Sequence, residues 1–515
     1  MKELIIIEYV ANLLILLFFY MHMFQLNSYF LNKHINWMKK NYKKIIIQSL
    51  FIILPTILLI FNNTITKVLA TLILAVSIIY NFPKGKAKIP LKITNRVKRM
   101  FITEFILIAL AFIVKNDGNL IFIKLGLVNL ITPIIGCIAN FINKPIEKSR
   151  QKHYINEAKK ILKDMPNLTV IGVTGSYGKT SVKNYLAKTL SAKYEVLATP
   201  KNYNTTMGVV KTIRENLRPT HQIFICEMGA THVGDIKEIC DIVKPKIGII
   251  TAIGPQHLEN FKSIDNIIKG KFELADSVKE NNGVVFLNYN NDYIAKHNLD
   301  MESYSYGVNN KELNYNAYDL KSSSRGLSFK ILDNKSDKEV EFKTTIIGKH
   351  NVINLTGAIC VANYLGVPLQ NLVSRVRDIK SVEHRLQLIS RENLTIIDDS
   401  YNSNPISSKS ALDTLSEFEG TKIIVTPGLI ELGNDENKYN FELGQYMADK
   451  CDYIFLVGQE HSKSILEGVL SKKFDENKIF TVNSPQEAMT QISQLNINGN
   501  VTVLLENDLP DNYNL

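Results

Sequence analysis

Long apolar runs separated by short polar loops fill the first 146 residues of the chain. The runs are Leu4–Leu26, Ile45–Phe61, Ile65–Phe82, Phe101–Val114 and Leu120–Ile142. A helix that crosses a membrane needs about 20 apolar residues, within a range of about 17–25. The first and last runs meet this length clearly, the second and third marginally, and the fourth is short and contains Glu104. The pattern predicts a transmembrane domain of about five spans over residues 1–146.

Basic residues are concentrated in every second loop of this domain. Between the first two runs lie Lys33, Lys39, Lys40, Lys43 and Lys44, and between the third and fourth lie Lys84, Lys86, Lys88, Lys92, Arg96, Lys98 and Arg99. The positive-inside rule therefore places the N-terminus outside and the chain after about residue 145 in the cytoplasm. No small-residue cleavage site follows the first run, so we expect a multi-pass protein held in the lipid bilayer and no cleaved signal peptide. Glu104 is either a functional carboxylate or a residue near the membrane interface, and we favour the second.

Beyond the apolar runs, β-branched segments alternate with helical ones. The first strand candidates are Thr169–Val173, Ile223–Met228, Ile247–Ile253 and Gly283–Asn288. This alternation predicts an α/β domain with a doubly wound sheet, to which Leu327–Ile347 adds antiparallel strands and Asn351–Leu365 a helix. A second α/β unit begins near Arg385, with strands expected at Thr395–Asp398, Lys422–Thr426, Tyr453–Val457 and Val501–Leu505. The predicted domains are therefore a central one over 147–383 and a C-terminal one over 384–515.

The first strand leads into a glycine-rich turn, since residues 170–181 read V-I-G-V-T-G-S-Y-G-K-T-S and a helical segment, Val182–Leu190, follows. In such a strand–turn–helix unit, turn amides and the helix N-terminus cradle phosphate oxygens. The order G-x-x-x-x-G-K-[ST] places a lysine on the β- and γ-phosphates of ATP and a hydroxyl on Mg²⁺. Val173 stands where the first glycine belongs, so the alternative is an ordinary turn with a chance match. The residues expected to bind ATP are Gly175, Ser176, Tyr177, Gly178, Lys179, Thr180 and Ser181.

Charge and cysteine content exclude several other classes. The net charge is +11, but much of the basic surplus lies in two loops of the membrane domain, so we expect no nucleic-acid partner. The five cysteines are widely spaced and form no C-x-x-C pair, so the sequence predicts neither a zinc site nor a disulfide framework. A reducing compartment is consistent with this cysteine usage.

Two polar residues follow strand ends in the central domain. Glu227 ends one predicted strand, and His257 follows another. Ligands of α/β proteins bind at the carboxyl ends of the strands, and Mg²⁺ takes a few hard oxygen ligands. Thr180 and Glu227 are therefore candidate Mg²⁺ ligands. For both Glu227 and His257, we favour a place in the site over a role in the surface or core.

The second α/β unit carries D-D-S-Y-N-S-N-P over residues 398–405, a strand that opens into an asparagine-rich turn. Asp399 is placed to accept hydrogen bonds from ribose hydroxyls. The alternative is a helix N-cap with turn-forming asparagines, and both can hold for different residues.

These motifs occur in an order that resembles the Mur ligase family, the ATP-dependent amide ligases of peptidoglycan precursor synthesis. They are T-G-S-Y-G-K-T-S at 174–181, N-Y-N-T-T-M-G at 202–208, E-M-G-A at 227–230, H-L-E-N-F at 257–261, K-G-K-F-E at 269–273, G-K-H-N-V-I-N at 348–354, H-R-L at 384–386, D-D-S-Y-N-S-N-P at 398–405 and E-L-G at 431–433. The chain is most similar to the MurF type. The resemblance implies a central P-loop ATPase domain and a C-terminal Rossmann-like domain, and the family's turn likewise lacks the first glycine.

The resemblance also implies residue roles. Catalytic candidates are Lys179, Lys271, His257 and Arg385. Thr180 and Glu227 would hold one Mg²⁺, and His257 and a carbamylated Lys271 a second. Asn351, with His350 and Asn354 as further candidates, would contact adenine, and Arg385 and Asp399 the phosphates and ribose. Substrate-binding candidates are Asn204, Tyr401, Asn402 and Asn404.

The implied reaction joins D-alanyl-D-alanine to a UDP-N-acetylmuramoyl-tripeptide. ATP activates the tripeptide carboxylate as an acyl phosphate, which the amine then attacks. The implied location is the bacterial cytoplasmic membrane, with the catalytic domains in the cytoplasm near membrane enzymes of cell-wall synthesis.

The chain also departs from the MurF type. Its membrane domain occupies the place of the usual uridine-nucleotide-binding domain, and the sequences before E-L-G and at the C-terminus differ from that type's L-G-D-M and K-G-S-R. The alternatives are therefore a membrane ligase for a lipid-linked or non-peptidoglycan carboxylate, and a non-catalytic ATP-binding membrane scaffold. Lys179, Glu227, His257 and Lys271 together argue against the scaffold.

Overall fold

The computed structural model describes residues 1–61, 63–83, 89–113, 119–401, 404–458, 462–495 and 497–507. The chain forms two compact units, one within Met1–Lys152 and one over His153–Asp508. The predicted substrate residue Asn402 lies outside the described residues.

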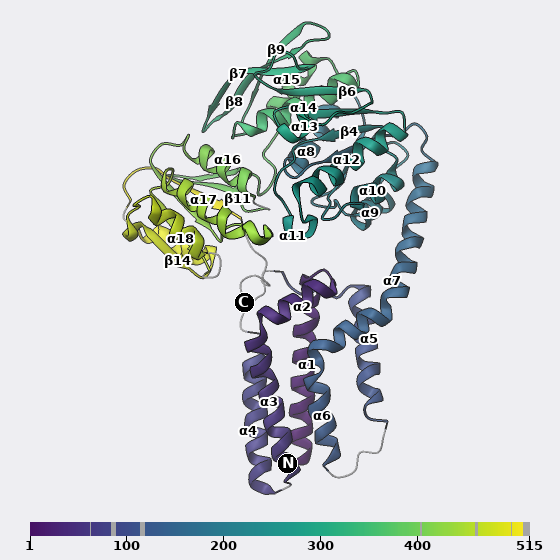
Figure 1. The fold of residues 1–515 in the computed structure, drawn as a ribbon, viewed down its shortest axis with the longest axis vertical. Coiled ribbons are helices and arrows are strands. Elements are labelled where there is room, and N and C mark those ends of the chain that lie inside the picture. Colours follow the sequence, from purple (N-terminus) through teal and green to yellow (C-terminus); the bar gives the residue numbers. More distant parts are fainter. Residues whose placement is uncertain are drawn as a thin grey trace. The chain divides into compact units, whose positions relative to one another are not determined.

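The first unit is helical (Figure 1). Its helices are α1 (Lys2–Leu26), α2 (Leu31–Lys40), α3 (Tyr42–Ile60), α4 (Thr64–Asn81), α5 (Asn95–Leu110), α6 (Leu120–Leu130) and α7 (Thr132–Lys163). Among the described residues, α1, α3 and α4 are long and apolar enough to cross a membrane, and α6 with α7, bent by 69°, would make a fourth candidate. The predicted fourth run falls in α5, which has only 16 residues. Among the described residues, three or four helices thus have the length and composition of a span, and the five spans stay a prediction.

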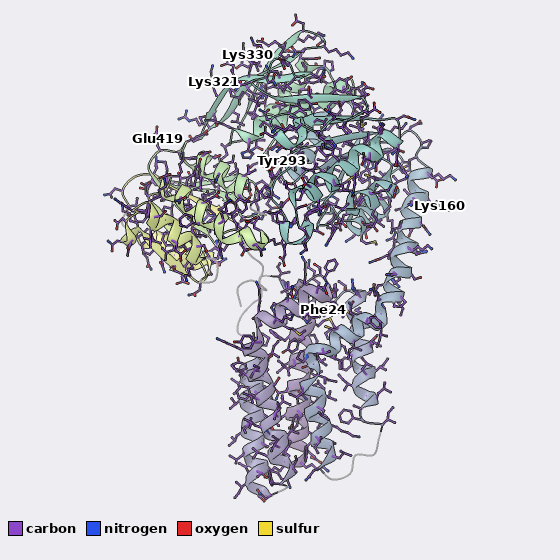
Figure 2. All side chains as sticks on the ribbon, in the orientation of Figure 1. Phe24, Lys160, Tyr293, Lys321, Lys330 and Glu419 are labelled. Atoms are coloured by element: carbon purple, nitrogen blue, oxygen red, sulfur yellow. The ribbon has the colours of Figure 1, made fainter. Side chains whose placement is uncertain are left out.

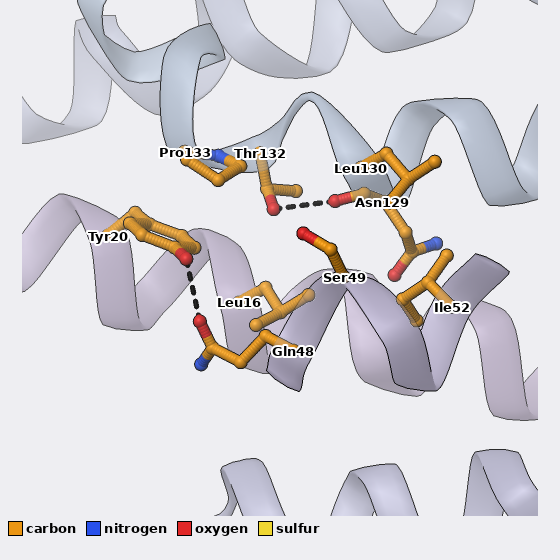
Figure 3. Close-up of a pocket in the computed structure, with 9 residues that line it drawn as sticks. All are labelled: Leu16, Tyr20, Gln48, Ser49, Ile52, Asn129, Leu130, Thr132 and Pro133. Atoms are coloured by element: carbon orange, nitrogen blue, oxygen red, sulfur yellow. Dashed lines mark hydrogen bonds between the residues drawn. The ribbon is translucent and has the colours of Figure 1, made fainter. Parts of the chain in front are cut away.

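Polar side chains inside this unit pair with one another. Tyr20 donates a hydrogen bond to Gln48 (2.6 Å), which donates to Asn81 (2.9 Å). Tyr20 and Gln48 also line a small cavity between helices (Figure 3). Glu104 is 2% exposed within this unit, and its Oε1 would be 3.3 Å from a Cβ built on Gly136; its place near a membrane interface stays a prediction.

The second unit begins with a nine-stranded sheet of order β2-β3-β1-β4-β5-β6-β7-β8-β9. The strands are β1 (Thr169–Thr174), β2 (Val196–Ala198), β3 (Ile223–Glu227), β4 (Ile247–Ile250), β5 (Val284–Asn288), β6 (Ser303–Val308), β7 (Tyr315–Ser323), β8 (Gly326–Asp333) and β9 (Lys338–Thr344). The pairs from β2 to β7 are parallel, and β7, β8 and β9 are antiparallel, which confirms the expected antiparallel extension. Figure 2 shows Lys321 and Lys330 on this extension, where Lys330 is paired with Glu339 at 2.9 Å.

Helices cover both faces of this sheet because alternate residues of each central strand point to opposite faces. Helices of this region are α8 (Lys179–Leu190), α9 (Thr206–Asn216), α10 (Asp235–Val243), α11 (Leu258–Phe261), α12 (Ile264–Glu280), α13 (Asp292–Ala295), α14 (His350–Tyr364) and α15 (Leu369–Arg377). Ile171 of β1 packs in a core with residues of α8 and α14, whereas its neighbour Val170 packs with residues of α10 and α12. The doubly wound prediction is confirmed, and β1, β3 and β4 lie side by side beneath the glycine-rich turn.

A six-stranded sheet of order β10-β11-β15-β12-β13-β14 follows. The strands are β10 (Gln387–Arg391), β11 (Leu394–Asp399), β12 (Thr421–Thr426), β13 (Tyr453–Val457), β14 (Ile479–Val482) and β15 (Val501–Glu506). Its helices are α16 (Pro405–Leu415), α17 (Glu436–Ala448), α18 (Ser462–Ser471) and α19 (Pro485–Gln494). Only β10 pairs antiparallel among these strands, so the second α/β unit is confirmed, with edge strands β10 and β14 that the sequence did not reveal.

Candidate active site

The turn between β1 and α8 requires glycine at two positions. Gly175 has φ +152°, and a Cβ there would lie 2.1 Å from the Thr251 hydroxyl oxygen. Gly178 has φ +82°, and a Cβ there would lie 2.7 Å from Oδ1 of Asn354. The Thr251 hydroxyl donates to the Tyr177 carbonyl at 2.5 Å, which ties the turn to the chain after β4. The glycines therefore allow a close approach that another residue would block.

The side chains of Ser176 and Tyr177 brace the turn against the loop after β4. Ser176 Oγ donates to the Gly254 carbonyl (3.0 Å), and Tyr177 OH donates to the Ile253 carbonyl (3.2 Å). The Ser176 amide donates to the Ala252 carbonyl at 2.7 Å. Of the residues predicted to bind ATP, these two thus hold the shape of the turn through their side chains.

Lys179 lies over the turn. Its Nζ donates to the carbonyls of Gly175 (2.8 Å) and Ser176 (3.0 Å). Burial lowers the pKa of Lys179 to about 8; the charge of Glu227 opposes this shift, and that of Arg385 adds to it. The ammonium has three N–H donors, of which these two carbonyls take two, so one donor is left for a phosphate oxygen.

Glu227 is the most heavily contacted residue of the site. Its Oε1 accepts hydrogen bonds from the Thr180 hydroxyl (3.1 Å) and the Asn204 amide (3.0 Å), and its Oε2 pairs with Lys183 Nζ at 3.0 Å. Burial by itself would raise the pKa of Glu227, but the charges of Lys183 and Lys179 and these hydrogen bonds lower it below its ordinary value. The structure therefore brings together Thr180, Asn204 and Glu227, which lie far apart in the sequence.

Lys183 is a residue that the sequence reasoning missed. It lies four residues after Lys179 on α8, and its side chain is 2% exposed. The spacing of the two lysines on one helix face was the available signal, since residues four apart are neighbours on a helix.

The arrangement of Thr180 and Glu227 fits one Mg²⁺. A hydroxyl and a carboxylate that already touch can share a small cation, which keeps several waters and completes its shell with phosphate oxygens. Among the residues that the structure describes, no group of three or more His, Cys, Asp or Glu side chains forms an all-protein metal site. Thr180 and Glu227 by themselves offer too few ligands for Mg²⁺, which would need further oxygens from water or from a bound nucleotide.

The residues expected at a second metal have other partners. His257 Nδ1 lies 2.5 Å from Oε2 of Glu431, so the histidine contacts the motif E-L-G. Lys271, on α12, is 2% exposed. Burial, with the charge of Lys179, holds the pKa of Lys271 well below its ordinary value, although Asp235 and Glu273 oppose the shift.

The second sheet contributes Asp399, Arg385 and Tyr401. Oδ1 of Asp399 accepts a hydrogen bond from the Leu386 amide at 3.1 Å, and burial raises the pKa of Asp399 to about 6 although Arg385 opposes this. The Arg385 guanidinium lies 5.3 Å from the ring centre of Tyr401. The Tyr401 hydroxyl accepts a hydrogen bond from Asn202, in the same loop as Asn204. This contact joins the two sheets at the candidate site.

Other candidates have structural partners. Asn404 caps α16, with Oδ1 accepting from the amides of Ile406 and Ser407, as the N-cap alternative expected. Asn351 is 4% exposed; its Oδ1 accepts from the Tyr185 hydroxyl at 3.0 Å. His350 Nδ1 lies 2.6 Å from Ser410 Oγ, and burial lowers the pKa of His350 to about 4.

Comparisons with known proteins identify the family of the chain. Residues 173–362 match the Mur ligase middle domain, and residues 384–506 match the Mur ligase glutamate ligase domain. UDP-N-acetylmuramoyl-tripeptide–D-alanyl-D-alanine ligase of Bacillus subtilis is 31% identical over 314 residues, which cover 60% of this chain and 66% of the relative. The ligase of the same name from Buchnera aphidicola is 30% identical over 317 residues, covering 61% and 67%. The crystal structure of MurF from Acinetobacter baumannii superposes with a TM-score of 0.63 at 27% identity, covering 70% of this chain and 77% of that one.

The alignments span about two thirds of the length of the two relatives, 66% and 67%. Both family matches fall within the unit that carries the glycine-rich turn, Glu227 and Asp399. The family that the sequence motifs predict is confirmed: the chain belongs to the Mur ligase family.

Proposed function

We propose that this chain is an ATP-dependent amide ligase of the MurF type, which joins D-alanyl-D-alanine to UDP-N-acetylmuramoyl-tripeptide. The observation that carries the proposal is the cluster beneath the glycine-rich turn, where Thr180 and Asn204 both contact Oε1 of Glu227. This cluster joins the phosphate-binding turn to the loop that faces Tyr401. The names of the relatives supply the substrates.

The chain's own residues have defined tasks in this reaction. Lys179 would donate its third N–H to the phosphates of ATP, and Thr180 and Glu227 would hold Mg²⁺. Bound Mg²⁺ supplies neutralisation of the charge on the transferred phosphoryl group. The substrate carboxylate attacks the γ-phosphorus and releases ADP; the amine then attacks the acyl phosphate, and phosphate leaves as the amide forms.

The C-terminal domain takes part by covering the nucleotide. Asp399 accepts hydrogen bonds from the ribose, Arg385 contacts the phosphates, and Asn351 lies against the adenine. The contact of Tyr401 with Asn202 holds the two domains together over the acyl phosphate, which water would otherwise hydrolyse.

Lys271 is proposed as a carbamylated lysine that, with His257, would hold a second Mg²⁺. Burial lowers the pKa of Lys271, which favours the neutral amine, and the nitrogen lone pair of that amine attacks CO₂ to give a carbamate after loss of a proton. The product is a carboxylate-like oxygen ligand at a buried position.

The helical unit is proposed to hold the ligase in the bacterial cytoplasmic membrane, with its catalytic domains in the cytoplasm near cell-wall enzymes of the membrane. Three described helices have the length and apolarity of membrane spans, and many of their apolar side chains are exposed. Extraction of whole-cell membranes with alkaline carbonate tests this: an integral protein stays in the pellet, and release into the supernatant contradicts the proposal.

The reaction is tested by phosphate release from the purified chain with ATP, Mg²⁺ and UDP-N-acetylmuramoyl-tripeptide, with and without D-alanyl-D-alanine. Lys179→Ala should abolish release, and Lys188→Ala, on the same helix, should leave it unchanged. Release that needs both substrates, with an amide product by mass, supports the proposal. If the protein binds ATP but releases no phosphate with this pair, a second candidate function gains support. That function is a ligase for a lipid-linked carboxylate, which the candidate spans favour.

A further inference from the structure

The two oxygens of the Glu227 carboxylate have different surroundings. Oε1 accepts hydrogen bonds from the hydroxyl of Thr180, the other proposed Mg²⁺ ligand, and from the amide of Asn204. Oε2 lies 3.0 Å from Nζ of Lys183 as an ion pair without hydrogen-bond geometry, and both side chains are almost completely buried, at 2% and 1% exposed. One oxygen thus lies beside the proposed metal ligand Thr180, and the other lies against the Lys183 side chain.

Lys183 is itself held in place from a second direction. Its Nζ donates to the carbonyl of Lys201 at 2.6 Å, in the loop that also provides Asn204. Lys201 has φ +47°, so the chain turns sharply at this carbonyl. Because the ammonium is anchored to backbone as well as to Glu227, it cannot swing away to release Oε2 without breaking a buried hydrogen bond.

The number of carboxylate oxygens that reach a cation affects which cation is bound. Ca²⁺ takes 6–8 oxygen ligands and readily accepts both oxygens of one carboxylate, whereas Mg²⁺ demands near-octahedral geometry and keeps several waters. A carboxylate that offers a single oxygen therefore favours Mg²⁺.

We propose that Lys183 is a positioning residue that sets the metal specificity of this site. Its side chain lies 3.0 Å from Oε2 of Glu227 and would keep a second cation away from that oxygen, so the carboxylate would bind a metal through Oε1 alone and select Mg²⁺ over Ca²⁺. The inference rests on the proposed nucleotide site and adds the residue that determines which cation binds there. It does not depend on which carboxylate and amine the enzyme joins.

The test is the affinity of the full-length, detergent-solubilised protein for ADP, measured by isothermal titration calorimetry in saturating MgCl₂ and separately in CaCl₂. The wild type should bind ADP more tightly with Mg²⁺. In Lys183→Met, which has similar length and no charge, the ratio of the two dissociation constants should shift towards Ca²⁺ by about tenfold, a typical effect of removing the partner of a metal ligand. Lys188→Met, the same change on the same helix, should keep the wild-type ratio.

Two further variants distinguish positioning from folding. Lys183→Arg keeps a cation against Oε2 and should retain the preference for Mg²⁺. Lys183→Gln removes the charge but keeps a polar side chain. It replaces Lys183→Met in the test if thermal unfolding shows that Lys183→Met is misfolded. An unchanged ratio in the uncharged variants, or an equal loss of affinity with both metals, would overturn the proposal.

Failure of the proposed function gives a different result. If the wild type binds ADP with a preference for Mg²⁺ but joins no amide, only the assigned reaction fails and the role of Lys183 is still measured. If the wild type binds ADP with neither metal, the nucleotide site and the role of Lys183 both fail.

Discussion

The pairing of Glu227 with Lys183 predicts a large and specific effect on stability. Glu227→Gln leaves the Lys183 ammonium, 2% exposed, without its counter-charge. Removing one partner of a buried ion pair costs about 3–5 kcal/mol, because the other charge stays buried and unpaired. The same reasoning gives a similar cost for Lys183→Met. The double variant should cost much less than the sum of the two, because no unpaired charge is left.

The expected shift in melting temperature follows from the size of the folded unit. Residues His153–Asp508 form one compact unit, and at about 2.1 cal/mol/K per residue its unfolding entropy is roughly 0.7 kcal/mol/K. A cost of about 3–5 kcal/mol therefore lowers its Tm by about 4–7 °C.

Far-UV circular dichroism of the full chain in detergent measures this shift. The single tryptophan, Trp37, lies in α2 of the other unit, so its fluorescence serves as an internal control that should not change. The reasoning is refuted if Glu227→Gln lowers the Tm by less than about 2 °C, or if the Tm of the double variant falls by the sum of the two single-variant shifts.

Three other perturbations follow from the site. Gly175→Ala should abolish ADP binding, because its Cβ would lie 2.1 Å from Thr251 Oγ1. Gly234→Ala is the control: Gly234 also has a positive φ, but nothing lies within 4 Å of its Cβ position, so this variant should bind ADP normally. An equal loss of binding in both variants would show that backbone strain alone is responsible. Burial raises the pKa of Asp399 to about 6, so its carboxylate becomes protonated as the pH falls through 6. KM for ATP should therefore rise below that pH in the wild type and stay constant in Asp399→Asn. A wild-type KM that does not change with pH would contradict the ribose role. Because burial holds the pKa of Lys271 well below its ordinary value, enzyme freed of CO₂ should lose activity and recover it with bicarbonate, whereas activity that ignores bicarbonate argues against a carbamate.

The elements that the sequence predicted best are those coded by neighbouring residues. The glycine-rich turn needs Gly175, Gly178, Lys179 and Thr180 in one short segment, so its shape follows from local backbone freedom and the strand and helix beside it. Buried parallel strands such as β3 and β5 are continuous apolar runs, which single them out. Edge strands β10 and β14, with weaker patterns, were missed.

The helical unit shows where composition is insufficient. The run Phe101–Val114 is apolar enough to suggest a span, but α5 ends at Leu110. The run Leu120–Ile142 is divided between α6 and α7 with a bend of 69°. Hydropathy reports how apolar a segment is; where a helix ends or bends depends on packing with its neighbours.

By itself, the sequence determined the order of the helical and α/β segments, the glycine-rich turn and the family, because these depend on local patterns and on motifs in a fixed order. Only the tertiary structure decided which distant side chains meet: Lys183 with Glu227, His257 with Glu431, and Asn202 with Tyr401. Such pairs join residues from separate elements, and their partners are chosen by sheet order and helix packing, which no local pattern encodes. Lys183 reads like any other lysine in the sequence, and only the fold shows that it is buried against Glu227.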